Sequence, residues 1–205
     1  MPPVNVYDHV DPNDFLTYLP ADFRESGKPI LVFLTSDSAD PAKETVAVET
    51  RVFHDESVAL GAKLFRAVKL NGEKITKDHP HWPTLGGKSL PRAIVVDPHG
   101  HRSATLEGND LTASGLFKAM RRTAARTFKQ DLETFVKASR DLLDDMDQIE
   151  AKQHQLAEKL KSAKPSEEKA LAAQAADLAK ALADAKERTA TLLRGANEDR
   201  IVAKG

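Results

Sequence analysis

The sequence predicts an α/β domain followed by an antiparallel hairpin of two long helices. Residues 1–126 alternate short apolar, β-branched runs with helical patterns and with breaks at Pro and Gly, which is typical of α/β domains. Between residues 127 and 195, apolar side chains recur at alternating spacings of four and three, the period of a coiled coil. We therefore expect an α/β domain at 1–126, an antiparallel coiled-coil α-hairpin at 127–195 and a flexible tail at 196–205.

The composition narrows the possible functions. The chain has 205 residues with 30 Lys and Arg, 31 Asp and Glu and a net charge of −1, which argues against a nucleic-acid partner. It has no cysteine, which excludes disulfides, thiolate metal ligands and thiol nucleophiles. The longest apolar run, Pro29–Leu34, is far shorter than the ~20 residues of a membrane span. The first residues lack the apolar segment of a signal peptide, so we expect a soluble cytoplasmic protein, or a periplasmic one if a leader has been removed.

Local patterns predict the elements of the α/β domain. Strands are expected at residues 30–35, 63–70, 92–97 and 101–107. The tight turn Pro98-His99-Gly100 makes the last two strands an antiparallel hairpin. One helix is expected at residues 41–51, opened by Ser38 or Asp40, and another from about Leu111, capped by Asn109-Asp110.

The C-terminal region is expected to form two helices that are joined at residues 163–165. In the first helix the four-three pattern comprises Phe128, Leu132, Phe135, Ser139, Leu142, Met146, Ile149, Gln153, Leu156 and Leu160. In the second it comprises Leu171, Ala175, Leu178, Leu182, Ala185, Thr189 and Leu192. Pro165 suits the first position of a helix. Because no Gly or Pro interrupts residues 116–164, one option is a continuous helix from Leu111 across Arg126 into the hairpin.

Two packing arrangements are open for this hairpin. An isolated pair of helices buries little apolar area, so it should pack either on its own α/β domain or on a second copy, in a bundle of four helices. The polar seam residues Ser139, Gln153 and Thr189 lower stability but fix the register of the pairing. A continuous helix would hold the hairpin away from the domain, so we expect a homodimer built by residues 127–195.

Four short motifs between residues 14 and 126 follow the order of motifs in a known family. They are Ser38–Lys43 (SADPAK), Val52–Val58 (VFHDESV), Leu90-Pro91 and Asp97–Gly100 (DPHG). In that order they resemble the Trp-Cys-Gly-Pro-Cys-Lys active site of the thioredoxin superfamily, the segment that follows it, the cis-proline and a hairpin turn. The similarity is to thioredoxin-like domains related to the DsbD C-terminal domain, which are bacterial disulfide oxidoreductases. It implies a thioredoxin-like fold with a cis peptide bond before Pro91.

The resemblance places the two cysteines of the family at Ala39 and Ala42. In the family, the first thiol lies at a helix N-terminus, whose unpaired N–H groups lower its pKa, and the second thiol resolves the mixed disulfide. The substrate-binding positions that the resemblance implies are Asp40, Pro41, Leu90 and Pro91. With methyl groups at 39 and 42, such a groove can bind an extended peptide but cannot exchange disulfides.

Two residues depart from the family pattern. Phe33 stands where thioredoxin carries a buried carboxylate, and Arg92 stands where a Thr often follows the cis-proline. Both departures weaken the case for a thioredoxin-type proton relay.

Two functions remain open on the sequence. In the first, the protein is a thiol-disulfide oxidoreductase that occurs here in a cysteine-less, catalytically dead form which still binds substrate polypeptide. In the second, it is a naturally redox-inactive thioredoxin-like adaptor that binds a protein partner and dimerises through its helical hairpin. Neither function needs a cofactor.

Other candidate sites have simpler interpretations. Gly86-Gly87-Lys88-Ser89 resembles the end of a phosphate-binding loop, but it precedes a strand and lacks the first glycine, so we interpret it as a flexible approach to Pro91. The histidine pairs at 79 and 81 and at 99 and 101 are interpreted as solvated loop residues, and no metal site is expected. A basic stretch is interpreted as a solvated helix face. It consists of Lys118, Arg121, Arg122, Arg126 and Lys129.

Overall fold

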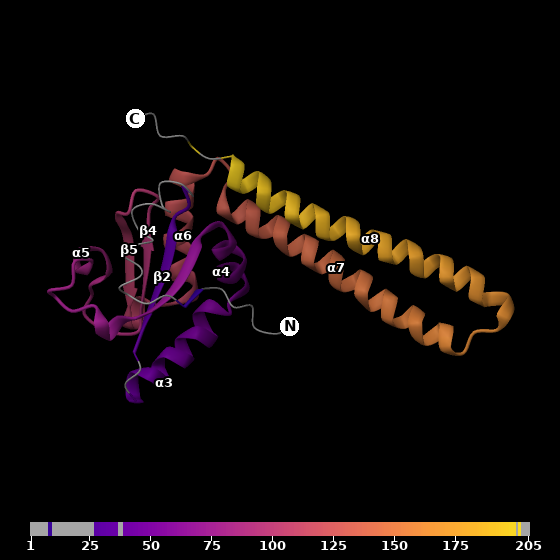
Figure 1. Ribbon diagram of the computed structural model, residues 1–205, viewed down its shortest axis with the longest axis horizontal. Coiled ribbons are helices and arrows are strands. Elements are labelled where there is room, and N and C mark those ends of the chain that lie inside the picture. Colours follow the sequence, from indigo (N-terminus) through magenta and orange to yellow (C-terminus); the bar gives the residue numbers. More distant parts are fainter. Residues whose placement is uncertain (1–7, 10–26, 37–38, 200, 202–205) are drawn as a thin grey trace. The chain divides into compact units, whose positions relative to one another are not determined.

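The computed structural model describes residues 8–9, 27–36, 39–199 and 201, with the backbone alone for 8–9 and 39–42 (Figure 1). The chain divides into two compact units. The first consists of Met1–Val136 with Ala196–Gly205, and the second is Lys137–Gly195. The division falls ten residues beyond the expected boundary at 126, and the tail groups with the first unit.

The first unit is built on a mixed five-stranded sheet in the order β1-β3-β2-β4-β5. The strands are β1 (Asp8–His9), β2 (Ile30–Thr35), β3 (Arg66–Asn71), β4 (Arg92–Val96) and β5 (Arg102–Glu107). β1 and β2 run parallel to β3, whereas β4 is antiparallel to β2 and β5 is antiparallel to β4. The expected α/β class and the antiparallel β4–β5 hairpin are therefore confirmed. Strand β1 was not expected.

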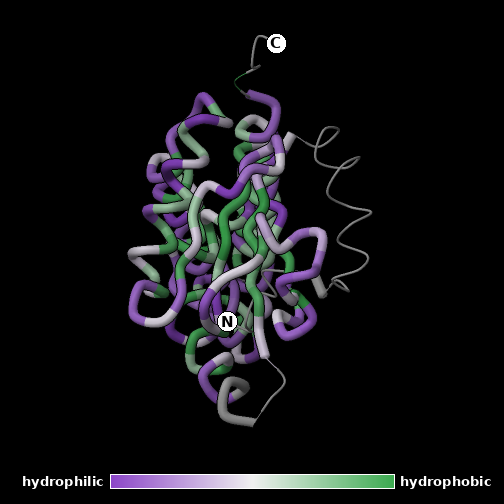
Figure 2. The backbone as a smooth tube through the Cα atoms, turned by 90° about the vertical axis from the view of Figure 1, so that its left-hand side faces the viewer, coloured by the Kyte–Doolittle hydropathy of each residue, from purple (hydrophilic) through white to green (hydrophobic). Residues whose placement is uncertain are grey.

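Alternating residues of the strands build two apolar layers, because successive side chains point to opposite faces. On one face, Ile30, Val32 and Leu34 join a core that the segment 75–90 covers with Ile75, Leu85 and the half-buried Trp82. On the other face, the ring of Phe33 lies 4.4 Å from that of Phe53, and helix α6 contacts β4 and β5. Figure 2 shows the hydrophobic residues concentrated along the central strands.

The first unit contains the two expected helices with shifted ends, and further helical segments that were not expected. Helix α3 (Ala39–Val48) passes into a π-helical turn, η1 (Glu49–Phe53). Helix α4 (Glu56–Gly61), which was not expected, is capped by Asp55, whose carboxylate accepts the N–H groups of Ser57 and Val58. The 3-10 turns are η2 (Ala62–Leu64), η3 (Gly72–Lys74) and η4 (Gly108–Asp110), and α5 (Trp82–Leu85) is a single helical turn.

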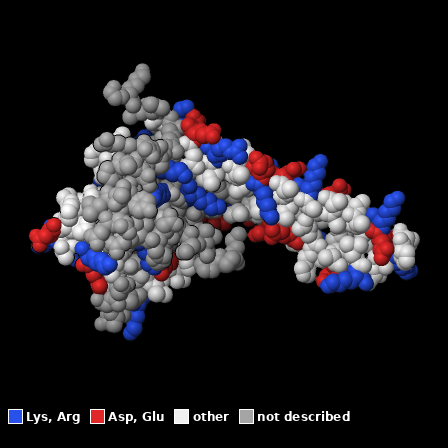
Figure 3. Space-filling model, in the orientation of Figure 1, with Lys and Arg blue, Asp and Glu red and all other residues white. Residues whose placement is uncertain are grey.

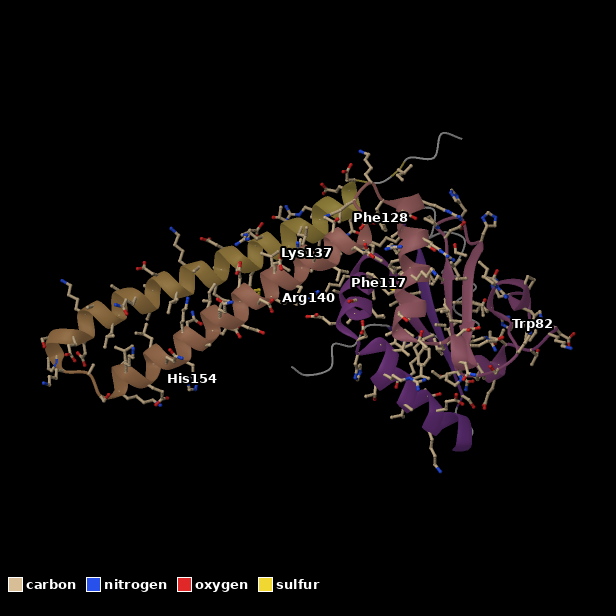
Figure 4. All side chains as sticks on the ribbon, turned by 180° about the vertical axis from the view of Figure 1, so that it is seen from behind. Trp82, Phe117, Phe128, Lys137, Arg140 and His154 are labelled. Carbon is tan, nitrogen blue, oxygen red and sulfur yellow. The ribbon has the colours of Figure 1, made fainter. Side chains whose placement is uncertain are left out.

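Helix α6 (Ala113–Thr127) is capped by Thr112 and not by Asn109-Asp110, which lie in the 3-10 turn η4. The hydroxyl of Thr112 accepts the N–H of Gly115 at 3.1 Å. From α6, Phe117 extends toward α4, and its ring would lie 3.4 Å from a Cβ placed on Gly61 (Figure 4).

The option of one continuous helix across Arg126 is wrong. Helix α6 ends at Thr127, Phe128 is extended, and α7 (Leu132–Lys161) begins after a new cap, Asp131, which accepts the N–H groups of Glu133 and Thr134. The extended segment pairs with the chain that follows α8. Lys129 N–H donates to the carbonyl of Asp199, and Ile201 N–H donates to the carbonyl of Thr127.

The second unit consists of α7 from Lys137 onward and of α8 (Pro165–Glu198) up to Gly195, which we call the helix pair. The two helices run antiparallel, since Leu142 lies near Leu192 whereas Leu156, further along α7, lies near Leu178, which comes earlier in α8. Asp145 pairs with Arg188, and Met146 contacts Thr189. Pro165 is the first residue of α8, as expected. The four-three positions of both helices are buried or half-buried between exposed neighbours. No helix in the described part of the chain has the length and apolar character that crossing a membrane requires.

The expected flexible tail differs from the structure at its start. Helix α8 continues to Glu198, and Ala196 is buried because it continues the four-three pattern after Leu192. Residues 202–205 lie outside the described part of the chain.

Candidate functional site

One edge of the sheet gathers the positions that the sequence singled out. Thr35 at the end of β2 pairs with Asn71 at the end of β3, and Leu34 pairs with Arg92 at the start of β4. Pro91 therefore lies at the edge from which the chain leaves β2 toward α3. Ala39 is the first residue of α3, and Ala42 lies in its first turn, as the motif predicts.

The structure describes these helix positions only in part. The side chains of Ala39, Asp40, Pro41 and Ala42 lie outside the described residues, and so does Ser38, which the sequence offered as a cap. The helix start is thus placed by its backbone.

Leu90 and Pro91 form one side of the candidate site at this edge, which we call the Leu90-Pro91 wall. The peptide bond between them is cis, as the resemblance implies, and Pro91 is buried. Leu90 is half-buried and packs against the sheet core. A Cβ on Gly72 would lie 2.4 Å from a methyl group of Leu90 and 3.1 Å from the Cβ of Leu34, so the side chain of Leu90 would have to shift if residue 72 were not a glycine.

Polar side chains fasten the ends of β2 and β3 beneath the same edge. The buried hydroxyl of Thr35 donates to the carbonyl of Leu70 at 3.3 Å, and the hydroxyl of Ser36 donates to the carboxylate of Glu73. The side chain of Asn71 accepts the N–H of Glu73 at 2.9 Å, which fixes the turn η3. This network was not predicted from the sequence, because Ser36 and Glu73 are 37 residues apart.

A buried arginine and a carboxylate hold the loop that leads to Pro91. Arg92 is only 3% exposed, and its guanidinium donates to the carbonyls of Leu85 at 3.0 Å and of Ser89 at 3.2 Å. Glu107 accepts the backbone N–H groups of Lys88 at 2.8 Å and of Ser89 at 3.1 Å. Burial lowers the pKa of Arg92, while Glu107 raises it in part and Arg102 lowers it.

This arrangement corrects one interpretation of the segment Gly86–Ser89 and agrees with another. The segment is held at both ends by Arg92 and Glu107, and is not a freely flexible approach to Pro91. The N–H groups of Lys88 and Ser89 already donate to a carboxylate, which argues against phosphate binding there.

Phe33, which departs from the family pattern, has a charged neighbour that was not predicted from the sequence. Lys69, opposite Phe33 in the β2–β3 register, forms an ion pair with Glu49 of η1. Its ammonium nitrogen lies 5.9 Å from the centre of the Phe33 ring. Both charged side chains are less than one-fifth exposed. A lysine between apolar strand residues was the only sequence signal for this pair.

The four histidines that the sequence singled out lie in two separate pairs. The rings of His79 and His81 are 5.8 Å apart, and His79 Nδ1 accepts the backbone N–H of His81. Burial lowers the pKa of His81, and His79 lowers it further. His99 and His101 lie at the β4–β5 turn, where His101 contacts the carboxylate of Asp97 at 3.4 Å. The first pair is half-buried, not fully solvated as expected. Within the described residues, no three His, Asp or Glu side chains are grouped to hold a metal ion.

The basic stretch at 118–129 is exposed, as predicted. Two of its side chains form ion pairs, Arg121 with Glu133 and Lys129 with Asp199. Lys118, Arg121, Arg122 and Arg126 lie on a solvated face of α6, whereas Lys129 lies in the extended segment after this helix.

The geometry of the sheet edge, namely a helix start, a cis-proline wall and a fixed loop, is the most developed candidate site in the described chain. Neither a scan against protein-family models nor a search of the curated proteins finds a match to this sequence.

Proposed function

We propose that the chain is a thioredoxin-like protein in a cysteine-less, redox-inactive form that binds extended polypeptide at this sheet edge. The observation that carries the proposal is the register Leu34–Arg92, which brings the start of α3 and the Leu90-Pro91 wall to one edge. The turn motif adds support. Asp97 accepts the N–H groups of His99 and His101, both at 2.9 Å, and Gly100 has a φ of 86°, which favours glycine.

The chemistry available at this edge is binding, not electron transfer. A thiol at position 39 would lie at the start of a ten-residue helix, where the helix dipole stabilises a thiolate. Alanine at 39 and 42 removes the nucleophile and the resolving group. What remains is an edge with a helix start on one side and a fixed, partly apolar wall on the other, suited to an extended chain.

A second candidate is a naturally inactive adaptor that docks a protein partner and forms a homodimer through α7 and α8. We interpret these two helices as an antiparallel coiled coil, because their four-three positions are the buried ones. The ion pair of Asp145 with Arg188 and the contact of Met146 with Thr189 agree with that pairing.

Single-cysteine trapping tests the peptide-binding proposal. Since the chain has no cysteine, Ala39→Cys introduces its only thiol at the candidate site. Ala183→Cys, on an exposed position of α8, is the matched control. We expect an unfolded polypeptide whose cysteine is activated as a disulfide with an aromatic thiol to react faster with the first variant, because the variant's thiolate then displaces the aromatic thiolate and no oxidant is needed. A cysteine-free peptide of the same sequence should slow only that reaction. Equal rates, or no competition, would contradict the proposal.

A further inference from the structure

Two hollows repeat along one face of the helix pair. The first, about 500 Å³, lies nearer to Lys137 and is lined by Leu142 and Leu192 among others. The second, about 370 Å³, lies nearer to the turn and is lined by Leu156 and Leu178 among others. Leu142 and Leu156 are 7% exposed, and their α8 partners are half-buried.

The hollows are equivalent positions of one repeating pattern. On each helix the paired leucines are 14 residues apart, from 142 to 156 and from 178 to 192. Fourteen residues are two heptads and about 21 Å of helix, so both hollows open on the same face.

The two hollows carry opposite charge on the α7 side. The first is bordered by Asp141, with Asp145 one turn further on, where it pairs with Arg188 at 3.7 Å. The second is bordered by Lys152 and Lys159. Acidic and basic side chains are interspersed over the helix pair in Figure 3, but along this side of α7 they are separated into an acidic half and a basic half.

We propose that this face binds a second copy of the chain in antiparallel orientation. A two-fold axis in the interface, perpendicular to the helices and midway between the hollows, places each first hollow on the partner's second hollow. The leucines that line the hollows of the two copies then face each other. Asp141 lies near the partner's Lys159, and Asp145 lies near the partner's Lys152. The contact closes on itself, as an isologous dimer requires. The proposal rests on the proposed association through α7 and α8, and adds the face, the orientation and the charge pairs.

The adjoining sides of the helix pair lack this self-complementarity. Along the other flank of α7 the basic Arg140 and Lys161 lie near the two ends, and the acidic Asp147 and Glu150 lie between them. An antiparallel copy would therefore bring basic ends together and acidic middles together. Figure 4 marks Arg140 and His154 on α7. Charge complementarity therefore favours the face with the two hollows.

Charge exchange in the full chain tests the pairing. Asp141 and Lys159 are 18 residues apart on one helix, about 27 Å, so they cannot touch within one copy. Asp141→Lys and Lys159→Glu should each weaken dimerisation roughly tenfold in sedimentation equilibrium, since each breaks two symmetric pairs and introduces repulsion. The double variant should return to within about threefold of the wild type, which only contact between copies explains.

Cross-linking gives a second readout in the cysteine-free background. A mixture of the single variants Asp141→Cys and Lys159→Cys, oxidised with added diamide, which takes up the two electrons and two protons of each disulfide formed, should give mixed disulfides in excess over either homodisulfide. The control Lys137→Glu/Asp144→Lys changes exposed charges on the outer side of α7 and should leave dimerisation unchanged.

Two results would overturn the proposal, and they are distinguishable. A wild-type chain that stays monomeric at all concentrations removes both this interface and any dimerisation through the helices. If the wild type is a dimer, but the double variant does not recover its affinity and the mixture does not form the mixed disulfide, only the proposed interface is wrong. Both results leave the peptide-binding proposal to its own trapping experiment.

Discussion

Arg92 shows how a single residue organises the candidate site. Its guanidinium holds two loop carbonyls and lies beside Glu107, which holds two loop N–H groups. Arg92→Met leaves the carbonyls of Leu85 and Ser89 without these donors and Glu107 without a neighbouring cation. We expect a loss of about 2 kcal/mol in the free energy of unfolding, measured by urea denaturation.

The matched control for Arg92 is Arg122→Met on the exposed face of α6, which should change stability by less than about 0.5 kcal/mol. The double variant Arg92→Met/Glu107→Gln should cost less than the sum of the two single variants, because the groups are coupled. A cost for Arg92→Met as small as that of the control would show that the loop does not depend on this residue.

His81 should make stability sensitive to mild acid. Burial lowers its pKa below the ordinary value of about 6.5, so between the folded-state pKa and that value the unfolded chain binds more protons than the folded one. The free energy of unfolding therefore falls as pH falls through this window. The loss between about pH 8 and about pH 5 should be smaller in His81→Gln than in the wild type, and unchanged in the exposed control His99→Gln. Identical pH profiles for all three proteins would contradict the assignment.

At the scale of elements, the start of α7 depends on a side-chain cap. The carboxylate of Asp131 accepts the N–H of Glu133 at 2.9 Å and the N–H of Thr134 at 3.2 Å. Asp131→Ala should cost about 1 kcal/mol in thermal or urea unfolding followed by circular dichroism. Asp144→Ala, exposed in the middle of the same helix, serves as the control, and an equal effect of both changes would count against the cap.

Gly72 in the turn η3 leaves space for the side chain of Leu90. A methyl group on Gly72 would lie 2.4 Å from Leu90, so Gly72→Ala should push Leu90 from its place while leaving the sheet intact. If the Leu90-Pro91 wall binds peptide, the competing cysteine-free peptide should bind several-fold more weakly, as measured by fluorescence anisotropy. Gly195→Ala, where a Cβ meets no atom within 4 Å, should leave peptide binding unchanged. Unaltered binding in Gly72→Ala would remove Leu90 from the site.

At the scale of the whole molecule, the first unit contains the residues that precede the helix pair in the sequence and those that follow it. Phe128, 1% exposed, lies between two hydrogen bonds that join residues 127–129 to 199–201. Phe128→Ala should therefore destabilise the first unit by about 3–5 kcal/mol. Trp82, the only tryptophan, lies in this unit and reports its unfolding by fluorescence. Val46→Ala, at a side chain that is 62% exposed, is the control, and a similar small effect of both changes would contradict the role of Phe128.

Local patterns in the sequence were sufficient to predict strands β2 to β5 and the two long helices α7 and α8. The bounds of strand β2 and the start of α8 at Pro165 were predicted to the residue. This was possible because an apolar run and a proline determine the backbone structure of their immediate neighbours in the sequence. The antiparallel β4–β5 turn followed from Pro98-His99-Gly100 for the same reason.

Tertiary structure alone decided the features that join distant residues. Phe128 continues the four-three spacing of α7 but lies in an extended segment between α6 and α7, where Thr127 and Lys129 pair with the chain after α8. The bonds of Arg92 to the loop, of Ser36 to Glu73 and of Lys69 to Glu49 likewise left no periodic signal. The physical reason is that periodicity records which side of an element is buried, whereas the partner of a buried charge or an extended segment is set by the packing of the whole unit.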